Sequence, residues 1–281
     1  MNLLLKKSAS KGEKSGVTFM NGKVRFQGVS LNVYSFAVDG ILIDTGAQSL
    51  KKYFEAFIDE VDFHQVMLTH FHEDHTGCAA YAAKSTQHPI YLNQKSIQSC
   101  SQKADYPLYR QLFWGRRKPF LAEPIPETFT SNTATWDAID TPGHAHDHKV
   151  FLSRETGQLF TGDLFVQERT KVVMTEESIP QITDSLQRVL TYDFEEIFCS
   201  HAGYVENGRV ALSRKLDYLL SIQHDVITLH EKGESAHEIC KKLFPKKYPI
   251  IKFSGGEWDS RHIVSSILRG QPKRENKDYY N

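Results

Sequence analysis

The stretch His70-Phe71-His72-Glu73-Asp74-His75 decides how the rest of the chain is interpreted. His70 and His72 are two residues apart, so both rings point to the same side of an extended segment. Asp74 and His75 follow at a turn and can reach the same region of space. Imidazole nitrogens mixed with a carboxylate are ligands of zinc, iron or manganese, and an oxygen donor favours a catalytic ion over a closed structural one.

Three more polar motifs lie downstream, each after an apolar strand and beside a glycine. They are T-P-G-H at 141–144, T-G-D at 161–163 and S-H-A-G at 200–203. Any one of them alone is more typical of an ordinary loop. Strand ends along one edge of a sheet are places where loops converge on a site. Together the four motifs supply five His and two Asp, enough for two metal ions, which argues against a mere surface histidine cluster.

The order of the expected elements predicts an α/β fold. Val29–Val38 and Ile41–Ile43, separated by Asp39-Gly40, predict a β-hairpin with a tight turn. Residues 47–58 have helical spacing, with Leu50, Phe54, Phe57 and Ile58 on one face. Further strands are expected at 66–68, 90–92, 135–139, 149–152, 159–160 and 196–199, and helices at 76–83 and 179–190. Strands alternating with helices after an initial hairpin indicate a sandwich of mixed sheets.

We expect three parts in the chain. Residues 1–16, rich in Lys, Ser and Gly, are expected to be a flexible tail. Residues 17–205 carry the motifs and form the catalytic domain. Residues 206–281 form a helical extension, with helices expected at 209–230, 236–243 and 258–268; Ser235 opens the second as a capping box.

Residues 94–134 interrupt the regular pattern with aromatic, arginine and proline residues. They are a candidate lid or substrate wall. The alternative is ordinary packing, because Leu108, Leu112 and Phe113 have helical spacing. Arg116-Arg117-Lys118 either holds an acidic group of the substrate or forms a solvated face.

Composition limits the classes of function. The chain of 281 residues has 34 Lys and Arg against 34 Asp and Glu, a formal net charge of +0, which disfavours nucleic-acid binding over its whole surface. From Lys232 onward, however, the chain contains eleven Lys or Arg and only six Asp or Glu. There is no apolar run of eighteen residues, so we expect no membrane-spanning segment. The apolar stretch at 3–5 is too short for a secretory signal, so none is expected. The four Cys lack a C-x-x-C pair and predict free thiols in the cytoplasm.

The ordered motifs resemble those of the metallo-β-lactamase superfamily of metallo-hydrolases over residues 25–205. Ile41–Gly46 (I-L-I-D-T-G), the H-x-H-x-D-H run and the three later motifs match its five motifs in order. The resemblance implies an αββα sandwich of two mixed sheets, so that residues 17–205 are a metallo-β-lactamase-like domain. The helical extension is similar to those of glyoxalase II and of relatives that end in a winged-helix-like part.

The resemblance also implies the roles of individual residues. Asp44 is expected to hydrogen-bond a ligand imidazole and fix its orientation. Many relatives read G-H-x-P-G-H where this chain has Gly143–His148, without the Pro-Gly turn. We therefore expect His148 to support the site or contact substrate as a catalytic residue, with His146 competing as a ligand. The implied metal ligands are His70, His72 and His144 for one ion, Asp74, His75 and His201 for the other, and Asp163 as a bridge.

The implied function is hydrolysis by two divalent metal ions, expected to be Zn²⁺ with Fe or Mn as alternatives. Two ions about 3.5–4 Å apart would share a hydroxide that attacks the carbonyl of a small ester, thioester or lactone. In this family Asp74 also helps to orient the nucleophile and passes its proton to the leaving group. Its presence points away from β-lactam hydrolysis and toward the glyoxalase-II-like, lactonase and ribonuclease branches.

Other functions stay open at this point. The main alternative is a phosphodiesterase or nuclease that contacts nucleic acid through its basic C-terminal part. Oxygenation of persulfides at a single iron needs only the first ligand group, so the second group argues against it. A metal-binding scaffold without catalysis is disfavoured by the complete ligand set. We expect a small-molecule substrate, no membrane partner, and a monomer or homodimer.

Overall fold

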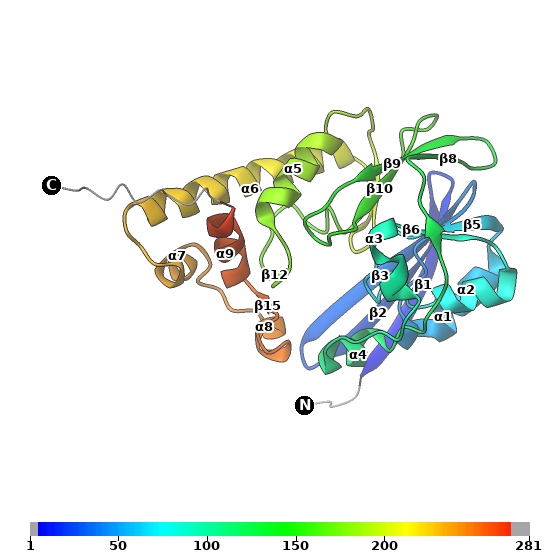
Figure 1. The fold of residues 1–281 in the computed structure, drawn as a ribbon, viewed down its shortest axis with the longest axis horizontal. Coiled ribbons are helices and arrows are strands. Elements are labelled where there is room, and N and C mark those ends of the chain that lie inside the picture. Colours follow the sequence, from blue (N-terminus) through cyan, green and yellow to red (C-terminus); the bar gives the residue numbers. More distant parts are fainter. Residues whose placement is uncertain (1–4, 271–281) are drawn as a thin grey trace.

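Two mixed β-sheets packed face to face form the centre of the computed structural model, which describes residues 5–270 (Figure 1). In the first sheet the strands follow chain order; the pairings up to β4 are antiparallel and those from β4 to β7 are parallel. Its strands are β1 (Lys6–Lys14), β2 (Val17–Phe26), β3 (Val29–Val38), β4 (Gly40–Ile43), β5 (Phe63–Met67), β6 (Ile90–Leu92) and β7 (Glu123–Pro124).

The second sheet has the order β14-β13-β11-β10-β9-β8, in which only β11 and β13 run parallel. A separate pair joins β12 to β15, so a segment before α5 meets the C-terminal extension. The bounds are β8 (Thr128–Thr130), β9 (Thr135–Asp140), β10 (Lys149–Ser153), β11 (Leu159–Gly162), β12 (Val173–Met174), β13 (Ile197–Cys199), β14 (Gly203–Val205) and β15 (Trp258–Asp259).

Helices cover both outer faces. Buried side chains of α1 to α4 pack with those of the first sheet, and those of α5, α6, α7 and α9 pack with the second. Their bounds are η1 (Gln48–Leu50), α1 (Lys51–Glu60), α2 (Ala79–Thr86), α3 (Gln94–Cys100), α4 (Leu108–Trp114), α5 (Ile179–Val189), α6 (Gly208–Glu231), α7 (Ala236–Leu243), α8 (Pro249–Phe253) and α9 (Arg261–Arg269). The expected αββα sandwich is confirmed.

Aromatic side chains fill the space between the sheets. Phe36 from the first sheet meets Phe160 and Phe198 of the second, and the latter two rings stack with centroids 4.9 Å apart. All three are buried, as is Trp136. Burying large rings removes much apolar surface from water, which stabilises the contact between the sheets.

The predicted hairpin and first helix are confirmed. Asp39 and Gly40 both have positive φ, of 47° and 81°, as a two-residue turn that follows the twist of the strands requires. The helix begins with a 3-10 turn and continues as α1, and Leu50, Phe54, Phe57 and Ile58 are buried. The amphipathic spacing read from the sequence is therefore the packing face of the helix.

The N-terminal expectation is wrong for residues 6–14. They form β1, which pairs antiparallel with β2 over its whole length. Its side chains are mostly exposed, so the polar composition gave no sign of a strand; backbone pairing, rather than burial, holds it. Residues 1–4 of the predicted tail lie outside the described residues.

The extension is helical as expected, with three differences. The helix predicted over 258–268 begins only at Arg261, because Trp258 and Asp259 pair with β12, and α8 was not predicted. The extension also shares one hydrophobic cluster with α5. The division at residue 205 stays a prediction, and residues 271–281 lie outside the described part. Within residues 5–270, no helix is long and apolar enough to cross a membrane.

Candidate metal centre

The polar motifs meet at one edge of the two sheets because each follows the end of a strand. The H-x-H-x-D-H run follows β5, His144 follows β9, and Asp163 follows β11. Gly162 is needed at the end of β11: its φ is 48°, and a Cβ there would lie 2.6 Å from Nε2 of His148. The sequence thus turns sharply at Gly162 and presents Asp163 to the site.

Three imidazoles form the first group of candidate ligands. Nδ1 of His72 lies 3.0 Å from Nε2 of His70 and 3.0 Å from Nε2 of His144. All three side chains are buried. Three ring nitrogens converging in this way present their lone pairs to one point, as ligands of a single metal ion do.

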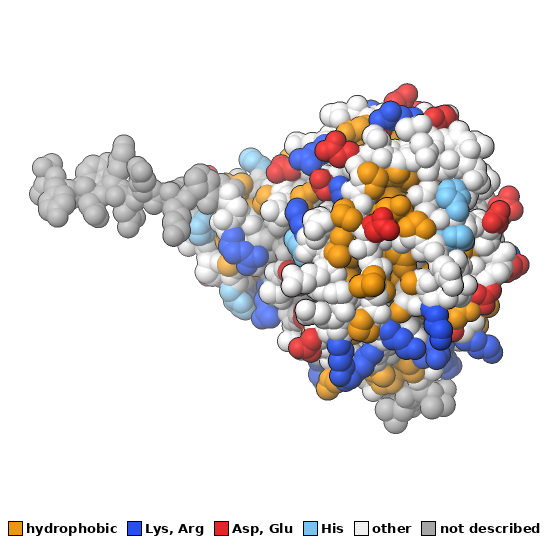
Figure 2. Space-filling model, turned by 45° about the vertical axis from the view of Figure 1, so that its right-hand side comes forward, with side chains coloured by type: hydrophobic (Ala, Val, Ile, Leu, Met, Phe, Trp, Pro, Cys, Tyr) orange, Lys and Arg blue, Asp and Glu red, His pale blue; other side chains and the backbone are white. Residues whose placement is uncertain are grey.

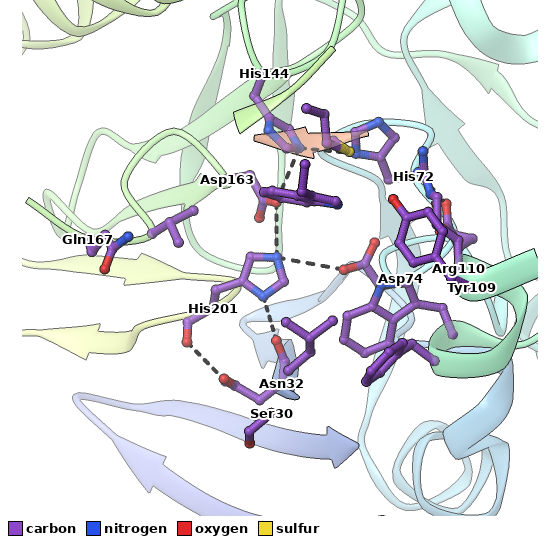
Figure 3. Close-up of a pocket in the computed structure, with 17 residues that line it drawn as sticks. Ser30, Asn32, His72, Asp74, Tyr109, Arg110, His144, Asp163, Gln167 and His201 are labelled. Atoms are coloured by element: carbon purple, nitrogen blue, oxygen red, sulfur yellow. Dashed lines mark hydrogen bonds and ion pairs between the residues drawn. The ribbon is translucent and has the colours of Figure 1, made fainter. Parts of the chain in front are cut away.

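The second group contains Asp74, His75 and His201. Oδ2 of Asp74 lies 3.8 Å from Nε2 of His75 and 3.6 Å from Nε2 of His201. Asp163 lies between the groups: its Oδ2 is 3.2 Å from Nε2 of His144 and 3.0 Å from Nε2 of His201, and its Oδ1 is 3.4 Å from Nε2 of His75. Figure 3 shows Asp163 between His144 and His201. The structure therefore brings together all seven side chains named as ligands.

The donor set fits divalent metal ions. Nε2 of His75 and Oδ1 of Asp163 are buried and lie 3.4 Å apart, but neither atom makes a hydrogen bond of good geometry among the described residues. Buried polar atoms without partners are costly unless a ligand satisfies them. Two groups of imidazoles that share a carboxylate match the preference of zinc, iron and manganese for nitrogen and oxygen donors.

Charges within the cluster set its protonation. Burial alone would lower the pKa of His201, but the Asp163 carboxylate raises it to about 9. The pKa of His75 is also raised, because Asp163 and Asp44 outweigh burial. Conversely, burial would raise the pKa of Asp163, but the neighbouring imidazoles hold it well below its usual value.

Metal binding to this centre is expected to release a proton from His201. A raised pKa favours the protonated ring, which cannot bind metal, so protons and metal compete below pH 9. Because the pKa of His75 is raised as well, apparent zinc affinity should rise between pH 7 and 9 by about tenfold per pH unit for each proton released. Calorimetry in buffers of different ionisation enthalpy measures the released proton directly; an affinity independent of pH over this range would contradict the assignment.

Asp44 supports the second group from behind. Its Oδ2 accepts a hydrogen bond from Nδ1 of His75 at 2.7 Å, which leaves Nε2 of that ring free to bind metal. The same carboxylate accepts the backbone N–H and hydroxyl of Thr69 and the hydroxyl of Ser200. Thr69 in turn contacts Nδ1 of His70 at 3.0 Å. One buried carboxylate thus orients rings of both groups.

Glu177 supports the first ligand group as Asp44 supports the second, by accepting a hydrogen bond from a ligand ring. Glu177 was not identified from the sequence. Its Oε2 accepts from Nδ1 of His144 at 3.1 Å, and its Oε1 accepts from the backbone N–H of Met174 at 2.8 Å. It is buried just before α5, 33 residues after its partner. A lone Glu at a helix start has no signature that distinguishes it from an ordinary surface residue.

Glu177→Gln is expected to weaken metal binding by about 10- to 100-fold, because the amide no longer stabilises the orientation of His144. Competition with a chromophoric chelator measures this affinity. Asp184→Asn, on the exposed face of α5, is the matched control and should bind metal as the unaltered chain does. Equal affinity in both variants would mean that Glu177 has no effect on the ligand.

The structure places His148 and His146 outside both ligand groups. His148 is buried; its Nε2 accepts from the backbone N–H of Asp163 at 3.0 Å and its Nδ1 lies 2.8 Å from the hydroxyl of Thr141. It supports the Asp163 loop and does not line the cavity, so the predicted substrate contact is corrected. His146 is exposed and lies 3.3 Å from the hydroxyl of Ser96, so it does not compete as a ligand.

A cavity of about 360 Å³ opens beside the centre. His72, Asp74, His144, Asp163 and His201 lie on its polar side. The opposite walls are largely apolar and come from distant segments: Leu31 from β3, Tyr109, Phe113 and Trp114 from α4, Val166, Met174 from β12, and Trp258 from β15. Figure 3 shows Tyr109 and Arg110 on the side of Asp74 opposite Asp163. The segment 94–134 therefore contributes a wall of the cavity.

Two expectations for that segment are wrong in part. Leu108 and Leu112 do not pack against the sheet; they are 76% and 40% exposed, while Phe113 is buried. Of the three basic residues at 116–118, Arg116 and Lys118 are exposed, as the solvated-face alternative predicts. Arg117 fits neither alternative, because it is buried and donates to the backbone carbonyls of Cys100 and Lys118. It holds the loop that follows α4.

Arg110 also has its partners within the protein. Its Nε and Nη2 donate to the two carboxylate oxygens of Glu73 at 2.6 and 2.7 Å, and its Nη1 donates to Glu257 at 3.2 Å. Glu73 lies within the H-x-H-x-D-H run and Glu257 in the extension. Although Arg110 lines the cavity, its N–H groups are engaged, so it joins three segments around the centre.

Residues 31–201 match the family model described as the metallo-beta-lactamase superfamily. The chain is 27% identical over 219 residues to an atrochrysone carboxyl ACP thioesterase from Passalora fulva, covering 74% of this chain and 58% of that protein. It is 32% identical over 148 residues to thioesterase pkgB from Emericella nidulans, covering 50% and 37% respectively. The chain thus spans less than two thirds of the length of these curated relatives.

Solved structures share the fold. A beta-lactamase domain protein from Burkholderia ambifaria matches with a TM-score of 0.68 at 18% identity, covering 95% of this chain and 91% of that one. At this identity the match bears on the fold alone. Because the match covers 95% of this chain, the shared fold includes the helical extension as well as residues 31–201.

Proposed function

Because the chain belongs to the metallo-β-lactamase superfamily, we propose that it is a metal-dependent hydrolase of a small thioester, ester or lactone, with a thioester as the first choice. The observation that carries the proposal is the convergence of seven buried or half-buried ligand side chains, five of which line one side of a cavity with apolar walls. Two relatives named as thioesterases support the choice among the three carbonyl substrates.

Each ligand group would hold one divalent ion, proposed to be Zn²⁺, since the same donors also accept iron and manganese. His70, His72 and His144 would hold the first, Asp74, His75 and His201 the second, and Asp163 both. When bound, two such ions supply Lewis acidity toward a carbonyl oxygen and lower the pKa of water to near neutrality.

The residues of the chain then do three things. Asp44 and Glu177 fix the ligand rings through Nδ1 of His75 and Nδ1 of His144. The apolar walls bind the organic part of the substrate and exclude bulk water from the polar side. Asp74 lines the cavity beside His201, where its carboxylate can take up a proton and pass it to the leaving thiolate.

A phosphodiesterase or nuclease is the second candidate, and one observation favours it. A cavity of about 850 Å³ in the extension is lined by Lys241, Lys247 and Arg261, and Asp259 is the one acidic residue among the described residues that line it. Such a cavity could bind a phosphate group. On the face shown in Figure 2, Lys and Arg side chains gather along the lower edge, and Asp and Glu side chains are scattered over the rest of that face.

A substrate panel on metal-loaded protein separates the candidates. We expect turnover of an acyl thioester at least about tenfold faster than of the matching oxygen ester, and no release of nitrophenol from bis-nitrophenyl phosphate. His70→Ala, which loses a ligand of the first group, is the inactive control. Phosphodiester hydrolysis without thioester hydrolysis would replace the first candidate by the second.

A further inference from the structure

A buried lysine of the extension contacts the loop that carries Asp163. Lys215 lies on α6 and is only 5% exposed. Its Nζ donates to the carbonyl oxygens of Leu164 and Phe165 at 2.8 and 2.7 Å. These are the two residues that follow Asp163, and no ion pair joins Lys215 to a carboxylate among the described residues. The hydrogen bonds that the ammonium group makes to described residues therefore go to the backbone carbonyls of this loop.

The loop is strained at the next residue. Val166 has φ of 51°, a left-handed conformation that is rare for a β-branched side chain. Its backbone N–H donates to Sγ of Cys199 at 3.3 Å, and its side chain lines the cavity. A residue in such a conformation persists only where its surroundings hold it, and such residues cluster at functional sites.

We propose that Lys215 is a positioning residue that holds the Asp163–Val166 loop in this strained conformation. The loop then directs the Asp163 carboxylate between the two ligand groups and sets Val166 into the cavity wall. The proposal rests on the proposed metal centre, and it gives the helical extension a specific part in building that centre.

Lys149 provides a matched comparison. It is as deeply buried as Lys215, at 7% exposure, and its Nζ also reaches protein oxygens, those of Asp140 at 2.8 Å and Ala138 at 3.5 Å. Those partners lie on β9, not on the Asp163 loop. Losing either lysine removes a buried cation, but only the loss of Lys215 frees the loop.

The test measures zinc affinity by chelator competition, together with urea unfolding of the metal-free protein. We expect Lys215→Met to lower the affinity for the more weakly bound of the two zinc ions at least about tenfold. Lys149→Met should lose comparable stability and keep its affinity within about threefold. Lys215→Arg, which keeps donors for both carbonyls, should restore part of the loss. Equal zinc affinity in Lys215→Met and Lys149→Met would overturn the proposal.

A second variant tests the strain itself. Glycine adopts the conformation of Val166 without strain, so Val166→Gly added to Lys215→Met is expected to recover most of the lost zinc affinity. No recovery would show that strain is not what Lys215 opposes. Should Lys215→Met not fold, Lys215→Gln, whose shorter side chain replaces the ammonium by a neutral amide, takes its place. We expect a smaller loss of zinc affinity there, and wild-type affinity would count against the proposal. These readouts need no substrate, so absence of thioester turnover would refute the proposed function alone.

Discussion

Asp163→Ala is expected to lose bound metal and at least about 1,000-fold in the rate of hydrolysis. The carboxylate oxygens of Asp163 face both ligand groups, so its removal affects both proposed ions at once. Removing a single donor that stabilises an oxyanion already costs about 10²–10³ in rate, and losing the shared ligand should cost more. Metal analysis of dialysed protein and thioester turnover measure the two effects.

His146→Ala is the control for this prediction. The residue lies close to the centre in sequence but is exposed and belongs to neither ligand group. It should retain near two metal ions per chain and nearly full activity. Full metal occupancy in Asp163→Ala would show that the bridging assignment is wrong, whatever happens to the rate.

Arg110→Met is expected to give the largest loss of stability, about 3–5 kcal/mol in the free energy of unfolding. The substitution keeps much of the apolar stem but leaves the buried carboxylate of Glu73 without its bidentate partner. It also breaks the contact with Glu257. Urea unfolding of the metal-free protein measures the change, and we expect substrate binding to weaken as well, because Arg110 lines the cavity.

The loss of folding stability in Arg110→Met should be larger at high pH than at low pH. Burial already raises the pKa of Glu73 despite Arg110, and removing the arginine should raise it further. A carboxyl group whose pKa is higher in the folded than in the unfolded state destabilises the fold as pH rises above the unfolded value of about 4.3. Arg110→Met should therefore be less destabilised at pH 5 than at pH 8.

Arg154→Met is the matched control. Arg154 also makes a bidentate contact with a carboxylate, that of Asp137, but it lies on the surface. Exposed ion pairs contribute little to stability, so this variant should unfold almost as the unaltered chain does. Equal losses in the two variants would show that burial of the Glu73 pair is unimportant.

The fold and the ligand positions could be predicted because they depend on local pattern. The Asp39-Gly40 turn and the spacing of Phe54 and Phe57 each express a rule that holds within a few residues. The motifs at strand ends carry their own order along the chain, so a resemblance could place them. β1 could not be predicted, because an exposed edge strand has no hydrophobic alternation to reveal it.

The supporting residues could not be predicted for a different reason. Glu177 and Lys215 act on partners 33 and about 50 residues away, and neither stands in a motif. A buried charge of this kind looks like any surface Glu or Lys until the tertiary structure shows what surrounds it. Sequence patterns identify groups that bind, whereas the groups that hold them in place are fixed by long-range packing.

The meeting of α4 with the extension has a practical consequence for protein engineering. Arg110 contacts Glu257, and the ring of Phe113 lies 5.1 Å from that of Phe253, although about 140 residues separate the members of each pair. Exchanging either segment alone for that of a relative would leave mismatched contacts between α4 and the extension, next to the cavity. Chimaeras intended to transfer substrate preference should therefore exchange both segments together.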